Sequence, residues 1–172
     1  MVFRNPNCYS YKIKFRPFSE EIATIGEEIR LWIHNIYSPL PDIYTLREEL
    51  PVLNSFRKAL QEEREHIILG DFNLHHLIWN NPGRFTYHTG ADQLLDVAAS
   101  KEMEQALPEG SVTWKARGTE SAIDLVFLIT AAHNALYRCG TREDLQYGSD
   151  HIPAVMEIQW TPAAKKEPKK RA

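Results

Sequence analysis

One segment constrains the fold more than any other: the short apolar run at residues 66–70, His-Ile-Ile-Leu-Gly, which stops at Asp71. The run is too short for an ordinary helix and lacks the alternation of a strand with one wet face. It is typical of a strand that is buried on both faces. The sequence therefore predicts a sheet covered on both sides, with Asp71 at the edge where this strand ends.

The segments around this run predict further strands and helices in alternation. A period of two, or a continuous apolar stretch, predicts strands at 9–15, 29–37, 111–114, 122–129, 135–139 and 154–160. Helical spacing predicts helices at 44–65 and 91–99, the second with Thr89 as its cap. Because the helices fall between strands, we expect an α/β fold with helices packed outside sheets.

Composition limits the class of protein and its compartment. The 172 residues suit one domain, which we assign to residues 1–160, and the 43% hydrophobic and 25% charged shares are ordinary for a globular protein. No apolar run has the length of a membrane span, and the N-terminus lacks the apolar core of a secretory signal. Two cysteines provide neither a disulfide framework nor a cysteine metal site. We therefore expect an intracellular protein that does not act in a membrane.

The net charge of −3 is unusual for a protein that binds nucleic acid through its phosphates, because such proteins carry a basic surplus. Five basic residues do crowd positions 165–171. We predict that residues 161–172 form a disordered basic tail. This tail could touch nucleic acid or serve as a nuclear address, or it is simply a solvated terminus.

Two polar residues follow the buried strand in the sequence Gly-Asp-Phe-Asn-Leu-His-His at 70–76. Asp71 and Asn73 would project into the space beyond the sheet edge. The carboxylate of Asp71 can order or deprotonate a water molecule, and Asn73 can hold that carboxylate or donate to a phosphate oxygen. The alternative is that the segment is only a turn, because Asp and Asn bond their own backbone readily.

A second group of polar residues stands before the last predicted strand, in Gly-Ser-Asp-His at 148–151. Asp150 offers a metal ligand and His151 a group that carries a proton at neutral pH. Asp124 interrupts an otherwise apolar strand, and a buried lone carboxylate needs a partner. We expect this partner to be a ring nitrogen of His151, which would orient the histidine and favour its charged form.

Four motifs in this order resemble the endonuclease/exonuclease/phosphatase superfamily, whose fold is DNase I-like. They are residues 33–39, Ile-His-Asn-Ile-Tyr-Ser-Pro; residues 70–76; residues 113–124, Thr-Trp-Lys-Ala-Arg-Gly-Thr-Glu-Ser-Ala-Ile-Asp; and Ser-Asp-His at 149–151. More narrowly, they resemble the endonuclease domain of fungal non-LTR (LINE-type) retrotransposon reverse transcriptases. The resemblance covers about residues 29–160 and implies a four-layer α/β/β/α sandwich.

The resemblance also implies roles for the singled-out residues. Asp71 would activate water beside Asn73, and His151, oriented by Asp124, would contact the scissile phosphate. Tyr37 would hydrogen-bond the phosphate or the leaving group; the alternative is a tyrosine that covers the core at a strand end. Substrate contacts would come from Thr113, Arg117, Ser121 and Ser149. Trp114 is expected in the core rather than as a base-stacking platform.

The implied reaction is the nicking of one DNA strand by in-line attack of water, with Mg²⁺ or Mn²⁺ neutralising the developing charge. Asp150 would bind the metal ion, since hard oxygen ligands suit these ions. No small-molecule cofactor is expected, and a reverse-transcriptase domain would accompany the domain in a full-length parent element. His75, His76 and His88 could form a transition-metal site, but we favour surface loop residues.

The sequence departs from the superfamily before Tyr37. The family opens with a strand that ends in Asn and a later one that ends in a metal-binding Glu, and neither matches here; Glu20, Glu21, Glu27 and Glu28 do not fit the pattern. We therefore expect an N-terminally truncated copy that nicks plasmid poorly or not at all. Three hypotheses stay open: an active nuclease, an inactive remnant with at most weak DNA binding, and a phosphatase or lipid phosphodiesterase on the same fold.

Overall fold

The structure of the chain is a computed structural model, and it describes residues 8–14, 30–38, 51–61, 65–80 and 88–159. The predicted basic tail at 161–172 lies outside the described residues and stays a prediction. No helix in the described ranges is long and apolar enough to cross a membrane. The elements, in chain order, are β1 (Cys8–Lys14), β2 (Arg30–Tyr37), α2 (Pro51–Ala59), β3 (Glu65–Asp71), α3 (Thr89–Ala99), β4 (Met103–Gln105), β5 (Trp114–Ala116), β6 (Thr119–Ser121), β7 (Asp124–Ile129), α4 (Thr130–Asn134), β8 (Leu136–Thr141), the 3₁₀ turn η1 (Glu143–Leu145) and β9 (Ala154–Ile158).

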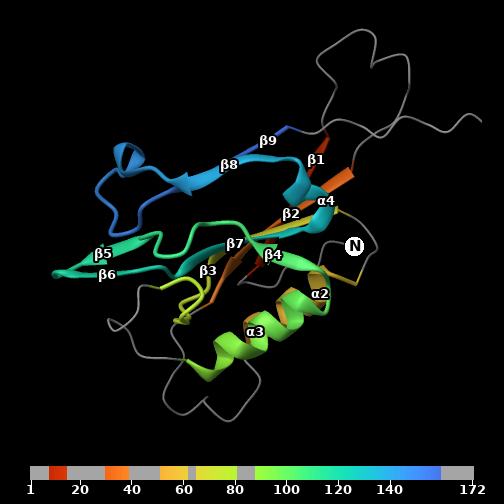
Figure 1. Cartoon of the computed structure of the whole chain (residues 1–172), viewed down its shortest axis with the longest axis horizontal. Helices are drawn as coiled ribbons and strands as arrows, with labels where there is room; N and C mark the ends of the chain where they lie inside the picture. The colour runs from red at the N-terminus through yellow and green to blue at the C-terminus, as the bar shows by residue number, and fades with distance from the viewer. Residues whose placement is uncertain (1–7, 15–29, 39–50, 62–64, 81–87, 160–172) are drawn as a thin grey trace, which may run out of the picture.

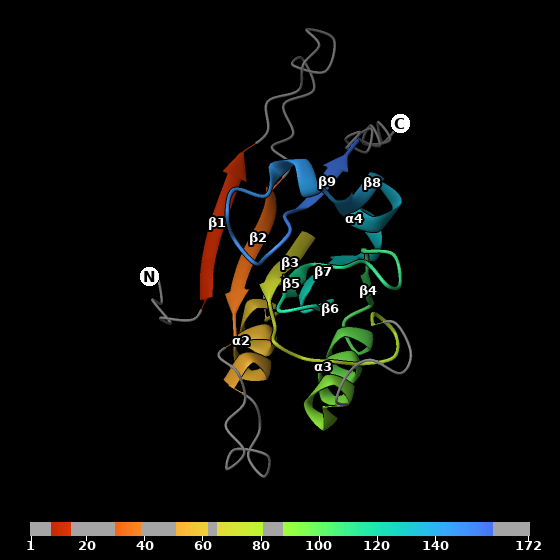
Figure 2. The same ribbon diagram turned by 90° about the vertical axis from the view of Figure 1, so that its left-hand side faces the viewer.

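Five strands form the main sheet in the order β1-β2-β3-β7-β4. Only β2 and β3 run parallel; the other neighbouring pairs are antiparallel. Two small antiparallel pairs, β5–β6 and β8–β9, stand apart from this sheet. Figure 2 shows β1, β2 and β3 side by side, with α2 and α3 below them in this view.

The described residues stack in layers. Figure 1 shows α2 and α3 on one side of the main sheet and the β8–β9 pair on the other. The two hydrophobic clusters follow this division: the larger joins the helices to one face of the sheet, and the smaller joins the other face to β8 and β9. The predicted α/β arrangement, with helices outside the sheet, is confirmed.

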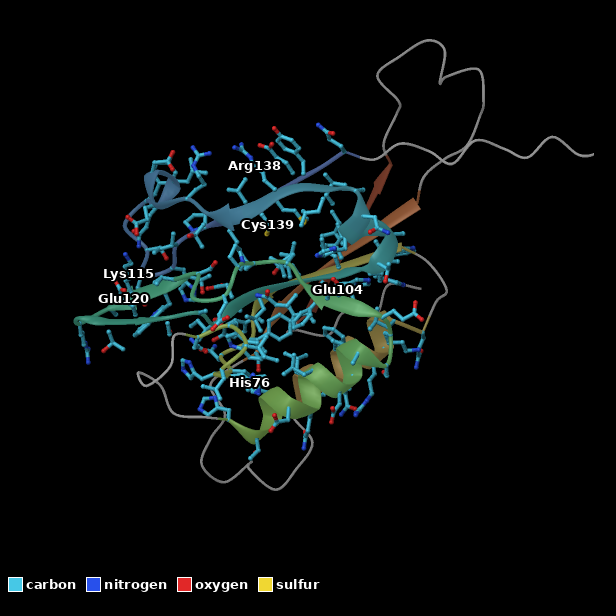
Figure 3. All side chains as sticks on the ribbon, viewed as in Figure 1. His76, Glu104, Lys115, Glu120, Arg138 and Cys139 are labelled. Atoms are coloured by element: carbon cyan, nitrogen blue, oxygen red, sulfur yellow. The ribbon has the colours of Figure 1, made fainter. Side chains whose placement is uncertain are left out.

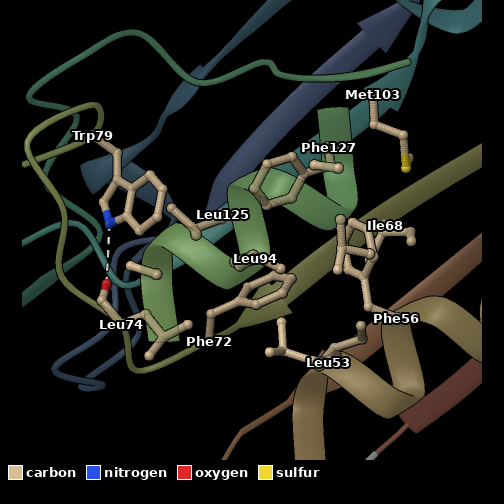
Figure 4. Packing of buried hydrophobic residues seen from close by; sticks show 14 of the residues in the cluster. Leu53, Phe56, Ile68, Phe72, Leu74, Trp79, Leu94, Met103, Leu125 and Phe127 are labelled. Carbon is tan, nitrogen blue, oxygen red and sulfur yellow. Dashed lines mark hydrogen bonds between the residues drawn. The ribbon is translucent and has the colours of Figure 1, made fainter. Parts of the chain in front are cut away.

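The larger cluster is centred on three phenylalanines that meet edge to face (Figure 4). The ring centroids of Phe56 from α2 and Phe127 from β7 are 5.6 Å apart, and those of Phe72 and Phe127 are 5.8 Å apart. This geometry favours aromatic pairs beyond the area they bury. Trp79 closes the cluster at one end, and its indole Nε1 donates to the carbonyl oxygen of Leu74 over 3.0 Å.

Strand β3 is buried on both faces, as its continuous apolar sequence predicts. Ile67 faces the smaller cluster and Ile68 the larger, and both side chains have no exposed surface. His66 is also buried, and its Nδ1 shares a hydrogen bond of 3.0 Å with Nε2 of His34 on β2. A strand between two packed layers has to satisfy its polar side chains internally, and this pair does so.

Several predicted boundaries are wrong. The helix predicted to run to Glu65 ends at Ala59, because Glu65 already pairs in the sheet. Thr89 lies inside α3, and the residue before the helix, His88, makes no side-chain cap bond. In the segment 111–114 only Trp114 is in a strand. The short elements β4 and α4 were not predicted, since three to five residues carry too little periodicity to be recognised.

Gly70 allows β2 and β3 to approach closely. Its φ is +137°, and a Cβ atom at this position would lie 1.9 Å from the carbonyl oxygen of Ile36. No side chain fits there, and the backbone conformation is one that only glycine adopts readily. Gly70 therefore fixes how the end of β3, with Asp71, lies against the end of β2.

We expect the substitution Gly70→Ala to lower the free energy of unfolding by about 3 kcal/mol or more, because it adds both a backbone clash and an unfavourable φ. Urea denaturation measures this change. Gly140→Ala on β8 is the matched control, since a Cβ there meets nothing within 4 Å. Equal losses in the two variants would contradict the close approach of β2 and β3.

Candidate active site

Three candidate residues lie in one row across the main sheet. The parallel register pairs Tyr37 with Asp71, and the antiparallel register pairs Asp71 with Asp124. Partners in adjacent strands point to the same face of a sheet. This face also carries Leu69, which packs in the cluster with β8 and β9, so the row faces the segment that leads into β9.

Asn73 holds the carboxylate of Asp71 in place. The backbone N–H of Asn73 donates to Asp71 Oδ1 over 3.0 Å, and its side-chain Nδ2 donates to Asp71 Oδ2, also over 3.0 Å. Nδ2 donates as well to the carbonyl oxygen of Ser38, over 2.7 Å. Asn73 has a φ of +50°, which Asn tolerates better than most residues. The turn and the functional interpretation are therefore compatible: the turn itself orients the carboxylate.

His151 reaches this row from the loop before β9. Its Nδ1 lies 2.9 Å from Asp124 Oδ2, so the hydrogen bond expected from the sequence is present. The backbone N–H of His151 also donates to Ser149 Oγ over 3.0 Å. With Nδ1 engaged by a carboxylate, Nε2 is the ring nitrogen left for a substrate.

The surroundings raise the pKa values of both Asp71 and His151. Burial, and then the negative charge of Asp124, raises the pKa of Asp71 to about 6, although the hydrogen bonds from Asn73 act against this rise. Burial alone would lower the pKa of His151, but the hydrogen bond to Asp124 and the charges of Asp124, Asp71 and Asp150 raise it above 6.5. A base and a charged histidine can therefore coexist near neutral pH.

A cleft of about 560 Å³ opens over these groups. Its lining includes Tyr37, Asp71, Asp124 and His151, together with the apolar ends of β2, β3 and β7. The other wall is the loop from Leu145 to Ala154. Pockets that combine apolar walls with a few convergent polar groups and perturbed pKa values are the usual setting of active sites.

Thr113 does not line the cleft and its side chain is buried, so its predicted substrate contact has no exposed surface in this structure and stays a prediction. The side chain has no exposed surface, and its Oγ1 accepts hydrogen bonds from the N–H groups of Ile123 and Asp124, over 3.0 and 2.9 Å. The Thr113 carbonyl also accepts from Ile152 N over 2.7 Å. Thr113 thus ties the start of β7 to the segment that carries His151.

Trp114 continues this connection and is not purely a core residue. It forms an isolated antiparallel bridge with His151, and its indole Nε1 donates to Asp150 Oδ2 over 2.9 Å. Asp150 is exposed and held by this bond. Trp114 is therefore a positioning residue for the loop that carries Asp150 and His151.

The β5–β6 hairpin, the proposed DNA-facing element, is built around a tight turn. Arg117 and Gly118 have φ values of +51° and +77°, as a two-residue turn of type I′ requires. Arg117 is exposed at the turn, whereas Ser121 at the end of β6 is 8% exposed. The substrate contacts of Arg117 and Ser121 both stay predictions, and that of Ser121 has little exposed surface in this structure. Ser149 lines the cleft and stays a candidate too.

The described residues contain no group of three or more His, Cys, Asp or Glu side chains that could hold a metal ion. This applies to the loop histidines, where the tilted rings of His75 and His88 have centroids 5.1 Å apart while His76 Nε2 lies 3.3 Å from Asp92. It applies equally to Asp150 and its neighbours. The donors present are of the hard oxygen type that Mg²⁺ prefers, but the described part of the chain does not by itself complete such a site.

Gln146 and Tyr147 also line the cleft, and neither was predicted from the sequence as a site residue. They stand directly before Gly-Ser-Asp-His, which is the signal that could have included them. Tyr147 is 87% exposed, more than any other large apolar side chain of the described residues.

The layered fold and the placement of these residues define the class of protein. The chain is a DNase I-like α/β protein of the endonuclease/exonuclease/phosphatase superfamily. The sequence profile of the endonuclease-reverse transcriptase family matches residues 31–155, and the chain belongs to this family. None of the curated proteins compared with the sequence matches it.

Solved structures share the fold at low sequence identity. The endonuclease domain of TRAS1, a telomere-specific non-LTR retrotransposon, superposes with a TM-score of 0.67 at 18% identity, over 89% of this chain and 62% of that one. The 3'-5' exonuclease NExo of Neisseria meningitidis gives 0.61 at 16% identity, over 77% and 64%. The catalytic domain of APE2 from Xenopus laevis gives 0.61 at 19% identity, over 93% and 57%. The chain thus spans less than two thirds of each of these structures.

The raised pKa of Asp71 predicts how stability depends on pH. A carboxylate with a folded pKa above its unfolded one favours the folded state while protonated, and that stabilisation is lost as the pH rises from about 3.8 through about 6. We therefore expect Asp71→Asn to raise the urea midpoint at pH 8, and to raise it less at pH 4. Asp96→Asn, on the exposed face of α3, is the control. An equal increase of the urea midpoint at pH 8 and pH 4 would contradict the raised pKa of Asp71.

Proposed function

We propose that the chain is a phosphodiesterase that hydrolyses DNA, acting as an endonuclease domain. The observation that carries this proposal is the hydrogen bond between Asp124 and His151 beside Asp71, in one cleft. A base with a pKa of about 6 and a histidine biased towards its charged form can supply general-base and electrostatic catalysis to the hydrolysis of a phosphate ester.

The residues suggest a division of work. Asp71, held by Asn73, accepts a proton from the attacking water, whose oxygen forms the new bond to phosphorus. The Nε2–H of His151, oriented by Asp124, donates to a phosphate oxygen and stabilises the charge that develops there. The bond to the leaving oxygen breaks opposite the attacking water, and that oxygen takes up a proton from solvent while the hydroxyl of the exposed Tyr37 can donate a hydrogen bond to it.

DNA as the substrate is supported by the family and by the character of the structural neighbours. The TRAS1 domain is an endonuclease, and NExo has been solved with a product DNA hairpin. We extend this to the present chain as part of the proposal, together with a reverse-transcriptase domain in a parent protein and a nuclear site of action. Phosphatase or lipid phosphodiesterase activity on the same fold stays a competing hypothesis that substrate tests separate.

We further propose that the reaction depends on a divalent metal ion. Asp150 stays the candidate ligand for Mg²⁺ or Mn²⁺, and such an ion, when bound, would neutralise charge on the phosphate. Because no group of three ligands gathers in the described residues, we expect weak metal binding and slow turnover. The same observation favours a second candidate, a catalytically inactive domain with at most weak DNA binding.

The experiment is a nicking assay on supercoiled plasmid with excess purified chain in Mg²⁺. We expect slow conversion to the open circle, its loss in EDTA, and a rate at least about a hundredfold lower in His151→Ala. His133→Ala is the matched control, since His133 on α4 faces Glu104 at 3.5 Å and does not line the cleft. Undetectable nicking by the unmodified chain would favour the inactive domain, and nicking that survives in His151→Ala would contradict the assigned site.

A further inference from the structure

Tyr147 stands at the rim of the cleft that also holds Asp71 and His151. Its side chain is 87% exposed. A single exposed aromatic ring is common on protein surfaces. An exposed ring on the wall of a candidate active site is different, because any ligand that fills the cleft also meets the ring.

The loop that carries Tyr147 is braced on both sides of this residue. Gln146 N donates to Glu143 O over 3.0 Å, and Gln146 Nε2 donates to Ser149 O over 2.6 Å. Ser149 Oγ in turn accepts from His151 N. These bonds fix the backbone around Tyr147 relative to His151. A ring carried on an ordered backbone loses less entropy on binding than one on a loose loop.

Among the described residues of β5, β8 and the turn that follows β8, three cations are engaged by carboxylates. Lys115 Nζ lies 2.7 Å from Glu143 and 3.3 Å from Glu120, as the close placement of Lys115 and Glu120 in Figure 3 illustrates. Arg142 pairs with Asp144 at 2.6 Å, and Arg138 on β8 pairs with Glu157. A phosphate would have to compete with these acids, so contacts of these three residues to a DNA backbone are weakened.

A substrate whose phosphates gain little from these three cations can draw further affinity from another contact at the cleft. Stacking of a base on an aromatic ring supplies it, and stacking tolerates any base sequence. In an intact duplex the faces of the bases are covered by their neighbours. Only an unpaired base, in a single strand, a loop or a frayed end, can offer its face to Tyr147.

We propose that the cleft binds a DNA strand with an unpaired base next to the scissile phosphate, and that Tyr147 stacks on this base. The proposal rests on the proposed nuclease function and adds to it the class of substrate. It makes Tyr147 a specificity-determining residue and predicts a preference for single-stranded or locally opened DNA over fully paired duplex.

The test is a binding measurement in EDTA, where hydrolysis is prevented, with a short single-stranded DNA that carries the fluorescent base 2-aminopurine and with its fully paired duplex. We expect tighter binding of the single strand, with quenching of the 2-aminopurine as it stacks. Tyr147→Ala should weaken single-strand binding about tenfold and abolish the quenching. Tyr147→Phe should retain both, because the ring is kept.

Tyr137→Ala is the matched control, since Tyr137 on β8 is 65% exposed but does not line the cleft, and this variant should bind as the unmodified chain does. The proposal is overturned if neither DNA binds, if the duplex binds as tightly as the single strand, if Tyr147→Ala leaves single-strand binding unchanged, or if Tyr147→Phe loses it. Binding that depends on Tyr147 without nicking therefore contradicts only the nuclease function, and nicking without this dependence contradicts only the stacking.

Discussion

Strand β3 holds its place between β2 and β7 because Gly70 has no side chain where the carbonyl of Ile36 passes. This close approach brings the ends of three strands level, and it sets Tyr37, Asp71 and Asp124 in one row. The two cores on either side of β3 then hold the row rigidly, since Ile67 and Ile68 face opposite clusters. The chemistry proposed for the cleft depends on this single packing constraint.

The other half of the site lies in the loop that carries Asp150 and His151, which has no helix or strand of its own. Contacts from Thr113 and Trp114 hold this loop. Thr113 receives the N–H groups at the start of β7 and offers its carbonyl to Ile152, while Trp114 bridges to His151 and bonds Asp150. Residues 113–114 and 150–152 are distant in the sequence, and these contacts hold them together. Thr113 and Trp114, adjacent in the sequence, thus connect the start of β7 to the segment that carries Asp150 and His151.

The sequence was informative where local chemistry demands a particular surrounding. A continuous apolar run required a strand covered on both faces, and a carboxylate inside an apolar strand required a partner, which is His151. The sequence did not predict the burial of individual polar side chains, because tertiary packing alone decides it. The resemblance implied substrate contacts for Thr113 and Ser121, yet both side chains are buried in this structure. The place of Tyr147 on the cleft wall leaves no periodicity in the sequence, and only its position directly before Gly-Ser-Asp-His could have indicated it.

The central claim is that Asp71 assists the attack of water on the phosphate. Its most direct test is to follow oxygen from the solvent into the product. A short DNA strand is cleaved with excess protein in water enriched in ¹⁸O, and the product's terminal phosphate is weighed by mass spectrometry. Water attack assisted by Asp71 predicts one solvent oxygen in that phosphate, and no product with Asp71→Ala. The absence of cleavage by the unmodified chain, a product phosphate without solvent oxygen, or undiminished cleavage by Asp71→Ala would contradict it.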